Sequence, residues 1–419
     1  MLQSIRKIIP PDWMSDPECV AVMRALCTGH DETESEAEAE AEAEEYVALF
    51  VGGCVRNTLL AMDVEDIDIA TIFTPDEVTQ KLKAAGIKVI PTGLDHGTLT
   101  AVTGCRGFEI TTLRKDVDTD GRRAVVAFSK DWLEDAMRRD FTMNTLLADV
   151  QGNIYDPTGQ GIDDLENGHV RFVGDAKARI AEDTLRILRF FRFHALYGAG
   201  EPDNDSLNVC AAAADKIPTL SHERITQEFF KILGAKNPVQ ILSHMFANGI
   251  LCEFDFGSHS QEMCSHLCSF QRNYKLAQIS ARLFALAGLS YDNIIKMEEL
   301  LLIPKLFKKD IKAIYHILEM NDLSHDHAVK AAIYKYGRVA SAQSLMIELA
   351  QDRVMNGYAR KALEIIQGWE IPNFPLSGTD LIEQGYTPGP ELGNKLNEME
   401  EFWIEQGFKP DRNLLINML

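Results

Sequence analysis

The sequence lacks several features, and each absence excludes a class of protein. It has no apolar run near the roughly 18 residues that a membrane-spanning helix needs, so we expect no membrane anchor. Residues 1–10 carry two basic side chains but no apolar segment of the kind found in secretory signals. The eight cysteines form no CxxC pair, which favours reduced thiols over a disulfide framework. We therefore expect a cytoplasmic protein.

One group of potential metal ligands is Cys264, His266 and Cys268. On a helix only Cys264 and Cys268 would share a face, and no second ligand pair follows at a spacing typical of zinc sites. The sequence therefore disfavours a zinc site there.

Basic residues are also scarce. The formal net charge is −21, which at first sight argues against a nucleic-acid partner. Residues 31–45, DETESEAEAEAEAEE, supply nine of these negative charges, and such a self-repelling run favours a solvated linker or a frayed helix. An acidic protein can still bind RNA where its basic residues gather on one face, because the local potential attracts the partner. We assign the run itself no function.

The hydrophobic content of 46% is enough for extensive cores, and 419 residues suggest several domains. Strand and helix patterns alternate from residue 46 to about residue 150. One helix should begin at Thr74, because Thr74, Pro75 and Glu77 form a capping-box pattern. From residue 163 onward the pattern is almost entirely helical, with a long helix expected over residues 176–197. This order predicts an α/β head followed by an all-helical part.

Residues 51–71, VGGCVRNTLLAMDVEDIDIAT, combine a glycine pair with two closely spaced carboxylates. Asp66 and Asp68 lie in a β-branched run, so both should point to the same face of a strand. Paired carboxylates repel unless a cation lies between them, and Mg²⁺ commonly uses one or two protein carboxylates together with phosphate oxygens. Gly52 and Gly53 would let backbone N–H groups approach a phosphate. The segment indicates phosphoryl or nucleotidyl transfer, although a solvated strand end fits these residues equally well.

Two further segments are compatible with this chemistry. Glu109 lies on a later strand, FEITTL, and could be a third acid in a two-metal site, although a surface glutamate is the plainer interpretation. Residues 138–144, RRDFTMN, join two arginines, which suit phosphate, to an Asp and an Asn, which can bond ribose hydroxyls. Plain ion pairing also explains this segment.

In residues 182–192, EDTLRILRFFR, Asp183 and Arg186 are three positions apart and should share a helix face. A fixed carboxylate beside a fixed guanidinium can imitate the hydrogen-bonding edge of a base. An ordinary salt-bridged helix is the plainer alternative. Residues 116–123, DVDTDGRR, read as a flexible polar loop that could close on a substrate.

These motifs, in this order, closely resemble the bacterial-type (class II) CCA-adding tRNA nucleotidyltransferases of the polymerase β superfamily, over nearly the whole chain. VGGCVRN…DIDIAT resembles the catalytic motif, DVDTDGRR the flexible loop, RRDFTMN the ribose- and triphosphate-sensing motif, and EDTLR the amino-acid template. SHERITQEFFKIL, residues 221–233, resembles the motif that braces the neck, and residues 375–403 resemble the tail of bacterial members. One departure is Asn57, where many members have Asp. It is not a metal-ligand position, so we expect little effect.

The resemblance implies site residues by role. The expected catalytic residues are Asp66, Asp68 and Glu109, with Asp66 and Asp68 holding two Mg²⁺ ions. The expected nucleotide-binding residues are Gly52, Gly53, Arg56, Arg138, Arg139, Asp140, Asn144, Asp183, Arg186, Arg189 and Arg192. The expected flexible-loop residues are Asp116, Asp120, Gly121, Arg122 and Arg123. A mildly basic stretch, residues 271–340, has 11 Lys/Arg against 7 Asp/Glu and offers Lys305, Lys308, Lys309 and Lys312 for RNA phosphates, or as a plain solvated face.

The fold implied is an α/β nucleotidyltransferase head, a mixed sheet with flanking helices, followed by an all-α neck, body and tail in a seahorse shape. The implied divisions are 1–45 (helix and acidic linker), 46–160 (head), 161–235 (neck), 236–330 (body) and 331–419 (tail). The implied reaction is template-independent addition of C, C and A to the tRNA acceptor end from CTP and ATP. The sequence points to no membrane and to no obligate protein partner.

Several related activities compete with this reading. A poly(A) polymerase of the same superfamily usually carries a basic C-terminal extension, whereas this sequence ends at Leu419, within the implied tail. The expected loop at residues 116–123 also fits CCA addition. A CC-only enzyme is disfavoured because such enzymes typically lack a full flexible loop, whereas an A-adding enzyme is harder to exclude. A non-enzymatic RNA-binding scaffold is disfavoured because all three acids and every nucleotide motif are present.

Overall fold

The computed structural model describes residues 2–27, 46–94, 97–104, 106–120, 123–251, 258–320 and 322–419. The acidic run and two loop residues, Gly121 and Arg122, lie outside the described residues. The chain divides into two compact units. The N-terminal unit comprises Met1–Ile232 and His244–Cys252, and the C-terminal unit comprises Leu233–Ser243 and Glu253–Leu419.

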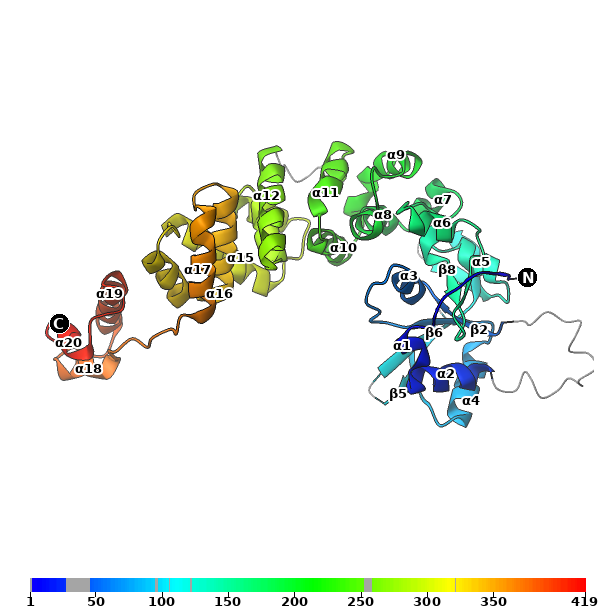
Figure 1. Ribbon diagram of the computed structural model, residues 1–419, viewed down its shortest axis with the longest axis horizontal. Helices are drawn as coiled ribbons and strands as arrows, with labels where there is room; N and C mark the ends of the chain where they lie inside the picture. The colour runs from blue at the N-terminus through cyan, green and yellow to red at the C-terminus, as the bar shows by residue number, and fades with distance from the viewer. Residues whose placement is uncertain are drawn as a thin grey trace, which may run out of the picture. The chain divides into compact units, whose positions relative to one another are not determined.

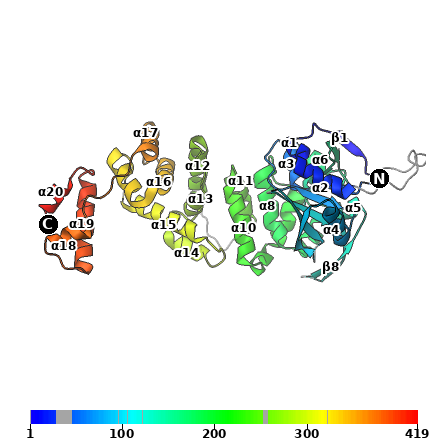
Figure 2. The same cartoon turned by 90° about the horizontal axis from the view of Figure 1, so that it is seen from below.

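The N-terminal unit is built on a mixed sheet (Figures 1 and 2). Its strand order is β1-β10-β9-β2-β3-β6-β5-β4. Its neighbouring strands pair antiparallel except β3 and β6, which are parallel. The strands are β1 (Ser4–Lys7), β2 (Ala48–Val51), β3 (Asp68–Thr71), β4 (Lys88–Gly93), β5 (Thr98–Thr103), β6 (Arg106–Thr112), β9 (Leu147–Ala148) and β10 (Asn153–Tyr155). The predicted mixed sheet is therefore confirmed.

Helices flank this sheet and continue beyond it. They are α1 (Asp12–Ser15), α2 (Pro17–Cys27), α3 (Gly53–Leu59), α4 (Pro75–Ala84), α5 (Trp132–Met137), η2 (Thr142–Asn144), α6 (Gly161–Glu166), α7 (Ala176–Glu182), α8 (Leu185–Tyr197), α9 (Asn204–Ala212), η3 (Ala214–Thr219), α10 (His222–Gly234) and α11 (Pro238–Ala247). Helix α2 packs against β2 and β6, and α4 packs against β4, β5 and α2. The predicted capping box of α4 is present, because Thr74 Oγ1 accepts from the Glu77 N–H and Glu77 accepts from the Thr74 N–H.

Two sequence expectations are corrected here. The long helix expected over residues 176–197 is two helices, because Asp183 adopts an extended conformation (φ −150°, ψ 107°) and its carboxylate accepts the N–H of Leu185. An Asp that bonds to the backbone two residues ahead favours such a break.

Six of the eight residues expected to form a flexible loop, 116–120 and 123, instead lie in the two strands of a hairpin. Strand β7 (Arg114–Asp120) pairs antiparallel with β8 (Arg123–Phe128). Val125 and Val126 in β8 belong to a β-favouring run, RAVVAF, which the loop reading did not weigh.

The C-terminal unit is helical throughout its described part. Its helices are α12 (Ser258–Tyr274), α13 (Ile279–Leu286), α14 (Tyr291–Met297), α15 (Lys305–Met320), α16 (Asp326–Ala350), α17 (Asn356–Gly368), α18 (Gly378–Glu383), α19 (Pro390–Glu405) and α20 (Arg412–Ile416). Helix α16 kinks at Gly337, whose positive φ of 84° suits glycine. One apolar core joins α16 to α18, α19 and α20 around Leu381 and Trp403. No helix of the described residues is long and apolar enough to cross a membrane.

Candidate nucleotide site

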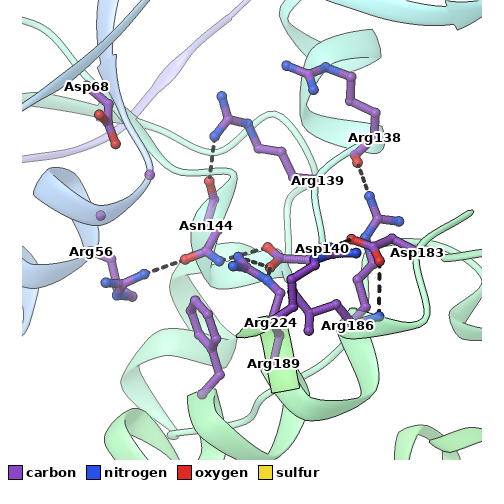
Figure 3. A pocket seen from close by; sticks show the side chains of 14 residues that line it. Arg56, Asp68, Arg138, Arg139, Asp140, Asn144, Asp183, Arg186, Arg189 and Arg224 are labelled. Carbon is purple, nitrogen blue, oxygen red and sulfur yellow. Dashed lines mark hydrogen bonds and ion pairs between the residues drawn. The ribbon is translucent and has the colours of Figure 1, made fainter. Parts of the chain in front are cut away.

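A polar cavity of about 460 Å³ opens within the N-terminal unit (Figure 3). Its walls come from the turn before α3, from β3, from the segment after α5, from the α7–α8 junction and from α10. It is lined by Gly52, Gly53, Arg56, Asp68, Arg138, Arg139, Asp140, Asn144, Asp183, Leu185, Arg186, Arg189, Phe193 and Arg224. Six of these residues are arginines and three are carboxylates, so the cavity favours an anionic ligand with several oxygens.

The glycine turn forms one side of the cavity. Gly52 precedes α3 with a φ of 72°, a conformation that L side chains rarely adopt. A Cβ atom at Gly52 would lie 3.5 Å from Arg139 Nη1, and one at Gly53 would lie 3.8 Å from Arg56 Nη2. The turn therefore brings the backbone close to two guanidinium groups.

The three candidate acids lie on or just before the neighbouring inner strands β3 and β6. Asp68 is the first residue of β3, and the parallel register sets it beside Glu109 on β6, with the exposed Asp66 two residues earlier. Burial, followed by the charge of Glu109, raises the pKa of Asp68 to about 6. Of these three acids, Asp68 alone lines the cavity.

A divalent cation fits this set of oxygen donors chemically. A bound cation would offset the repulsion that raises the pKa of Asp68, and no described side chain forms an ion pair with any of the three acids. Among the described residues, no three metal-ligating side chains already form a complete cage. This is compatible with Mg²⁺, which usually takes only one or two protein carboxylates and completes its shell with water and phosphate.

A hydrogen-bonded chain crosses the floor of the cavity. Arg56 Nη1 donates to Asn144 Oδ1 at 2.6 Å, and Asn144 Nδ2 donates to Asp140 Oδ1 at 2.9 Å. Arg189 Nε then donates to the other oxygen of Asp140 at 2.7 Å. Burial alone would raise the pKa of Asp140. Arg189 and Asn144 lower the pKa by more than burial raises it, so the pKa lies below its usual value. The predicted residues from three motifs thus form one charged network.

Arg138 and Arg139 are held by a carboxylate that the motif analysis missed. The buried Asp135 on α5 accepts from Arg138 Nη2 at 2.6 Å on one oxygen and from Arg139 Nη2 at 3.0 Å on the other. Burial alone would raise the pKa of Asp135. The two arginines lower the pKa by more than burial raises it, so the pKa lies below its usual value. The three- and four-residue spacings from Asp135 to the arginine pair were a signal that could have identified it.

Asp183 and Arg186 both line the cavity, and the Arg186 N–H donates to the backbone oxygen of Asp183 at 3.0 Å, but their side chains bond to other residues. Asp183 Oδ2 accepts from Arg224 Nη2 at 2.7 Å, and its Oδ1 accepts from the Leu185 N–H at 3.0 Å. Arg186 donates to Glu182 at 2.5 Å and to the backbone oxygen of Arg138 at 3.2 Å. Arg224 on α10 was not expected in the site, because it is far from Asp183 in sequence and belongs to residues 221–233, which resemble the motif that braces the neck.

Other predicted residues lie elsewhere. Arg192 is not among the cavity residues and forms an ion pair with Glu228 on α10. The four candidate lysines lie on α15 in the C-terminal unit, where Lys308 pairs with Glu298 at 2.8 Å. Asp116 and Asp120 lie on β7 and Arg123 on β8.

The comparisons with known proteins agree with this geometry. A family profile described as "Poly A polymerase head domain" matches residues 48–171, and one described as "Probable RNA and SrmB- binding site of polymerase A" matches residues 201–254. The fold and the site therefore define a nucleotidyltransferase.

Two relatives and one solved structure identify the kind of nucleotidyltransferase. "CCA tRNA nucleotidyltransferase 1, mitochondrial" of Danio rerio is 33% identical over 384 residues, covering 88% of this chain and 86% of the relative. The "CCA-adding enzyme" of Oceanobacillus iheyensis is 42% identical over 202 residues, covering 48% of this chain and 49% of the relative. The Bacillus stearothermophilus CCA-adding enzyme in complex with CTP superposes with a TM-score of 0.70 at 25% identity, covering 86% of this chain and 89% of that one. The chain belongs to the family of class II CCA-adding tRNA nucleotidyltransferases.

Proposed function

We propose that this protein adds C, C and A in order to the 3′ end of tRNA, using CTP and ATP and no nucleic-acid template. The observation that carries the proposal is the single cavity in which Asp68, six arginines and the Asp183–Arg186 pair meet. Phosphate, sugar and base of one nucleotide would each find a different set of partners there. Solved structures of relatives in complex with CTP, with ATP and with tRNA share the fold.

In the proposed reaction the tRNA 3′-hydroxyl attacks the α-phosphate of the nucleotide, and pyrophosphate leaves. Arg56 and Arg139, beside the glycine turn, would bind the triphosphate and hold its leaving portion. Asp140 and Asn144 would contact the ribose. Asp183 and Arg186 would hydrogen-bond to the base, and for this Asp183 would exchange its bond with Arg224 or share it.

Asp66 and Asp68, with Glu109 beside them, are the residues that would hold divalent cations. Such cations, when bound, supply positive charge near the attacking and leaving oxygens. Asp68 and Glu109 would fix the position of the bound cation, because the parallel pairing of β3 and β6 holds these two residues side by side.

We further propose that the residues after the head serve RNA binding and that residues 161–235, 236–330 and 331–419 act as neck, body and tail. The exposed Lys305, Lys309 and Lys312 share one face of α15 and suit phosphate contacts that do not read sequence. The hairpin β7–β8 would move as the site changes from C to A addition. A cytoplasmic location remains our expectation, although relatives include proteins named as mitochondrial.

A gel assay tests the proposal. The protein is given tRNA that ends at the discriminator base, or tRNA that already ends in CC, each with CTP alone, with ATP alone and with both. Stepwise addition of C, C and A followed by a stop supports it. A long A tail would indicate a poly(A) polymerase, addition of A only to tRNA that already ends in CC would indicate an A-adding enzyme, and no addition would overturn the assignment.

A further inference from the structure

Arg56 has more partners than a simple phosphate-binding arginine needs. A guanidinium carries five N–H donors. In the described part of the chain, Nε and Nη2 donate to Asn57 Oδ1 at 3.2 and 2.9 Å, Nη1 donates to Asn144 at 2.6 Å, and Nη2 donates to Tyr197 Oη at 2.8 Å. Four donors are therefore engaged, and the fifth N–H, on Nη1, remains for a ligand.

Tyr197 makes two kinds of contact with Arg56. Besides the hydrogen bond to its hydroxyl, the guanidinium carbon lies 4.1 Å from the centroid of the Tyr197 ring. The same carbon lies 5.2 Å from the centroid of Phe193, one helical turn earlier on α8, and the two rings are 5.4 Å apart. Both distances allow favourable cation–π contact.

Tyr197 itself does not line the cavity, and no motif of the sequence includes it. It lies at the last residue of α8, whereas Arg56 lies on α3, so this contact ties the helix that begins beside Asp183 to the helix that follows the glycine turn. Without it, the guanidinium would lose the hydroxyl acceptor and the nearer of the two aromatic rings that contact it from α8.

We propose that Tyr197 is a positioning residue that fixes the guanidinium of Arg56, so that one N–H on Nη1 serves a single phosphate oxygen of the nucleotide. This inference rests on the proposed function, because it takes the ligand of the cavity to be a triphosphate. Its consequence is specific: Tyr197 affects how tightly the triphosphate binds and leaves the choice between C and A unchanged.

Two variants separate the contributions of the side chain. Tyr197→Phe removes the hydroxyl acceptor and keeps the ring, and Tyr197→Leu removes both. Leu196→Ala, at an exposed neighbour on the same helix, is the matched control. Binding of inorganic tripolyphosphate and of CTP is measured by calorimetry without tRNA, and thermal melting checks the fold of each variant.

We expect Tyr197→Phe to weaken tripolyphosphate binding about 3- to 10-fold, since a hydrogen bond to a charged group is lost while three others on Arg56 remain. Tyr197→Leu should weaken it further, and Leu196→Ala should not change it. In turnover, KM for CTP and ATP should rise together, with kcat and the order of C and A little changed.

A double-mutant cycle decides whether the effect passes through Arg56. In an Arg56→Ala background, Tyr197→Phe should cause no further loss of tripolyphosphate binding. The same loss in both backgrounds, or unaltered binding in Tyr197→Phe, would overturn the inference. If wild type binds tripolyphosphate and Tyr197→Phe weakens that binding, but no CCA is added, the positioning role stands and the proposed function falls. If wild type binds no tripolyphosphate, the positioning role falls, and the gel assay alone decides the proposed function.

Discussion

Arg224 on α10 donates a 2.7 Å hydrogen bond to Asp183, the residue that separates α7 from α8. Both side chains are more than one-third exposed, so the ion pair should add at most about 1 kcal/mol to stability. The ion pair matters because it fixes the orientation of the Asp183 carboxylate, which lies at the cavity wall.

Arg224→Ala should therefore affect activity far more than folding. We expect kcat/KM for both CTP and ATP to fall roughly 10-fold, since Asp183 loses the group that fixes one of its oxygens. Steady-state incorporation into tRNA measures this, and the melting temperature should change little. Glu223→Ala, at the exposed neighbouring position, is the control. Equal activities of the two variants would contradict the role of Arg224.

Asp135→Asn tests the support of the arginine pair. Asparagine offers one acceptor oxygen where the carboxylate offers two, so residue 135 can no longer hold both Arg138 and Arg139. Because the carboxylate is buried, we expect a loss of about 3 kcal/mol in the free energy of unfolding, together with weaker CTP binding. Urea unfolding and CTP titration measure the two effects. An Asn variant with wild-type stability would show that the charge is not needed.

Asp66→Ala tests the acid set. Asp66 is exposed, so its removal should leave the fold intact, whereas nucleotide incorporation should become undetectable. Asp63→Ala, at another exposed acid of the same segment, should retain activity. Normal turnover by Asp66→Ala would refute the proposed site.

Glu348 in α16 predicts a pH dependence in the C-terminal unit. Burial raises its pKa to about 7, with Asp322 adding to the shift, Arg353 opposing it, and the Leu323 N–H donating to its carboxylate at 3.0 Å. The folded protein therefore keeps this proton at a pH where the unfolded chain has lost it. This contribution to stability is full below about pH 4.5 and is lost as the pH rises to about 7, by on the order of 2–3 kcal/mol.

Glu348→Gln keeps an acceptor oxygen for Leu323 and removes the titration. Urea unfolding followed by circular dichroism at pH 5, 6, 7 and 8 should show the wild type losing stability relative to the variant as the pH rises. A constant difference across this range would mean that Glu348 has an ordinary pKa.

The sequence predicted most of the site because its chemistry lies in short motifs. Asp66 and Asp68 were expected to share a strand, but β3 begins at Asp68 and Asp66 lies before it. Their association with Glu109 became concrete only when the parallel pairing of β3 and β6 was known. Periodicity predicted one helix across residues 176–197, since an apolar stripe does not reveal that Asp183 is extended and that its carboxylate accepts the N–H of Leu185.

Contacts between residues far apart in the chain could not be predicted from the sequence. Arg224 and Tyr197 contact Asp183 and Arg56 across 41 and 141 positions, and no local pattern encodes such contacts. Arg192 shows the reverse case, because it belongs to a recognisable motif yet pairs with Glu228 away from the cavity. Motifs therefore predicted the chemical groups, and tertiary packing decided which of them meet.

The central claim is that protein side chains choose the nucleotide, and Arg186→Ala tests it most directly. The measurement is the sequence of the nucleotides added to tRNA ending at the discriminator base, with CTP and ATP both present. We predict C, C and A in order for the wild type and mixed C and A at each position for the variant, with total incorporation less affected than selectivity. Faithful addition of C, C and A by Arg186→Ala would contradict the claim.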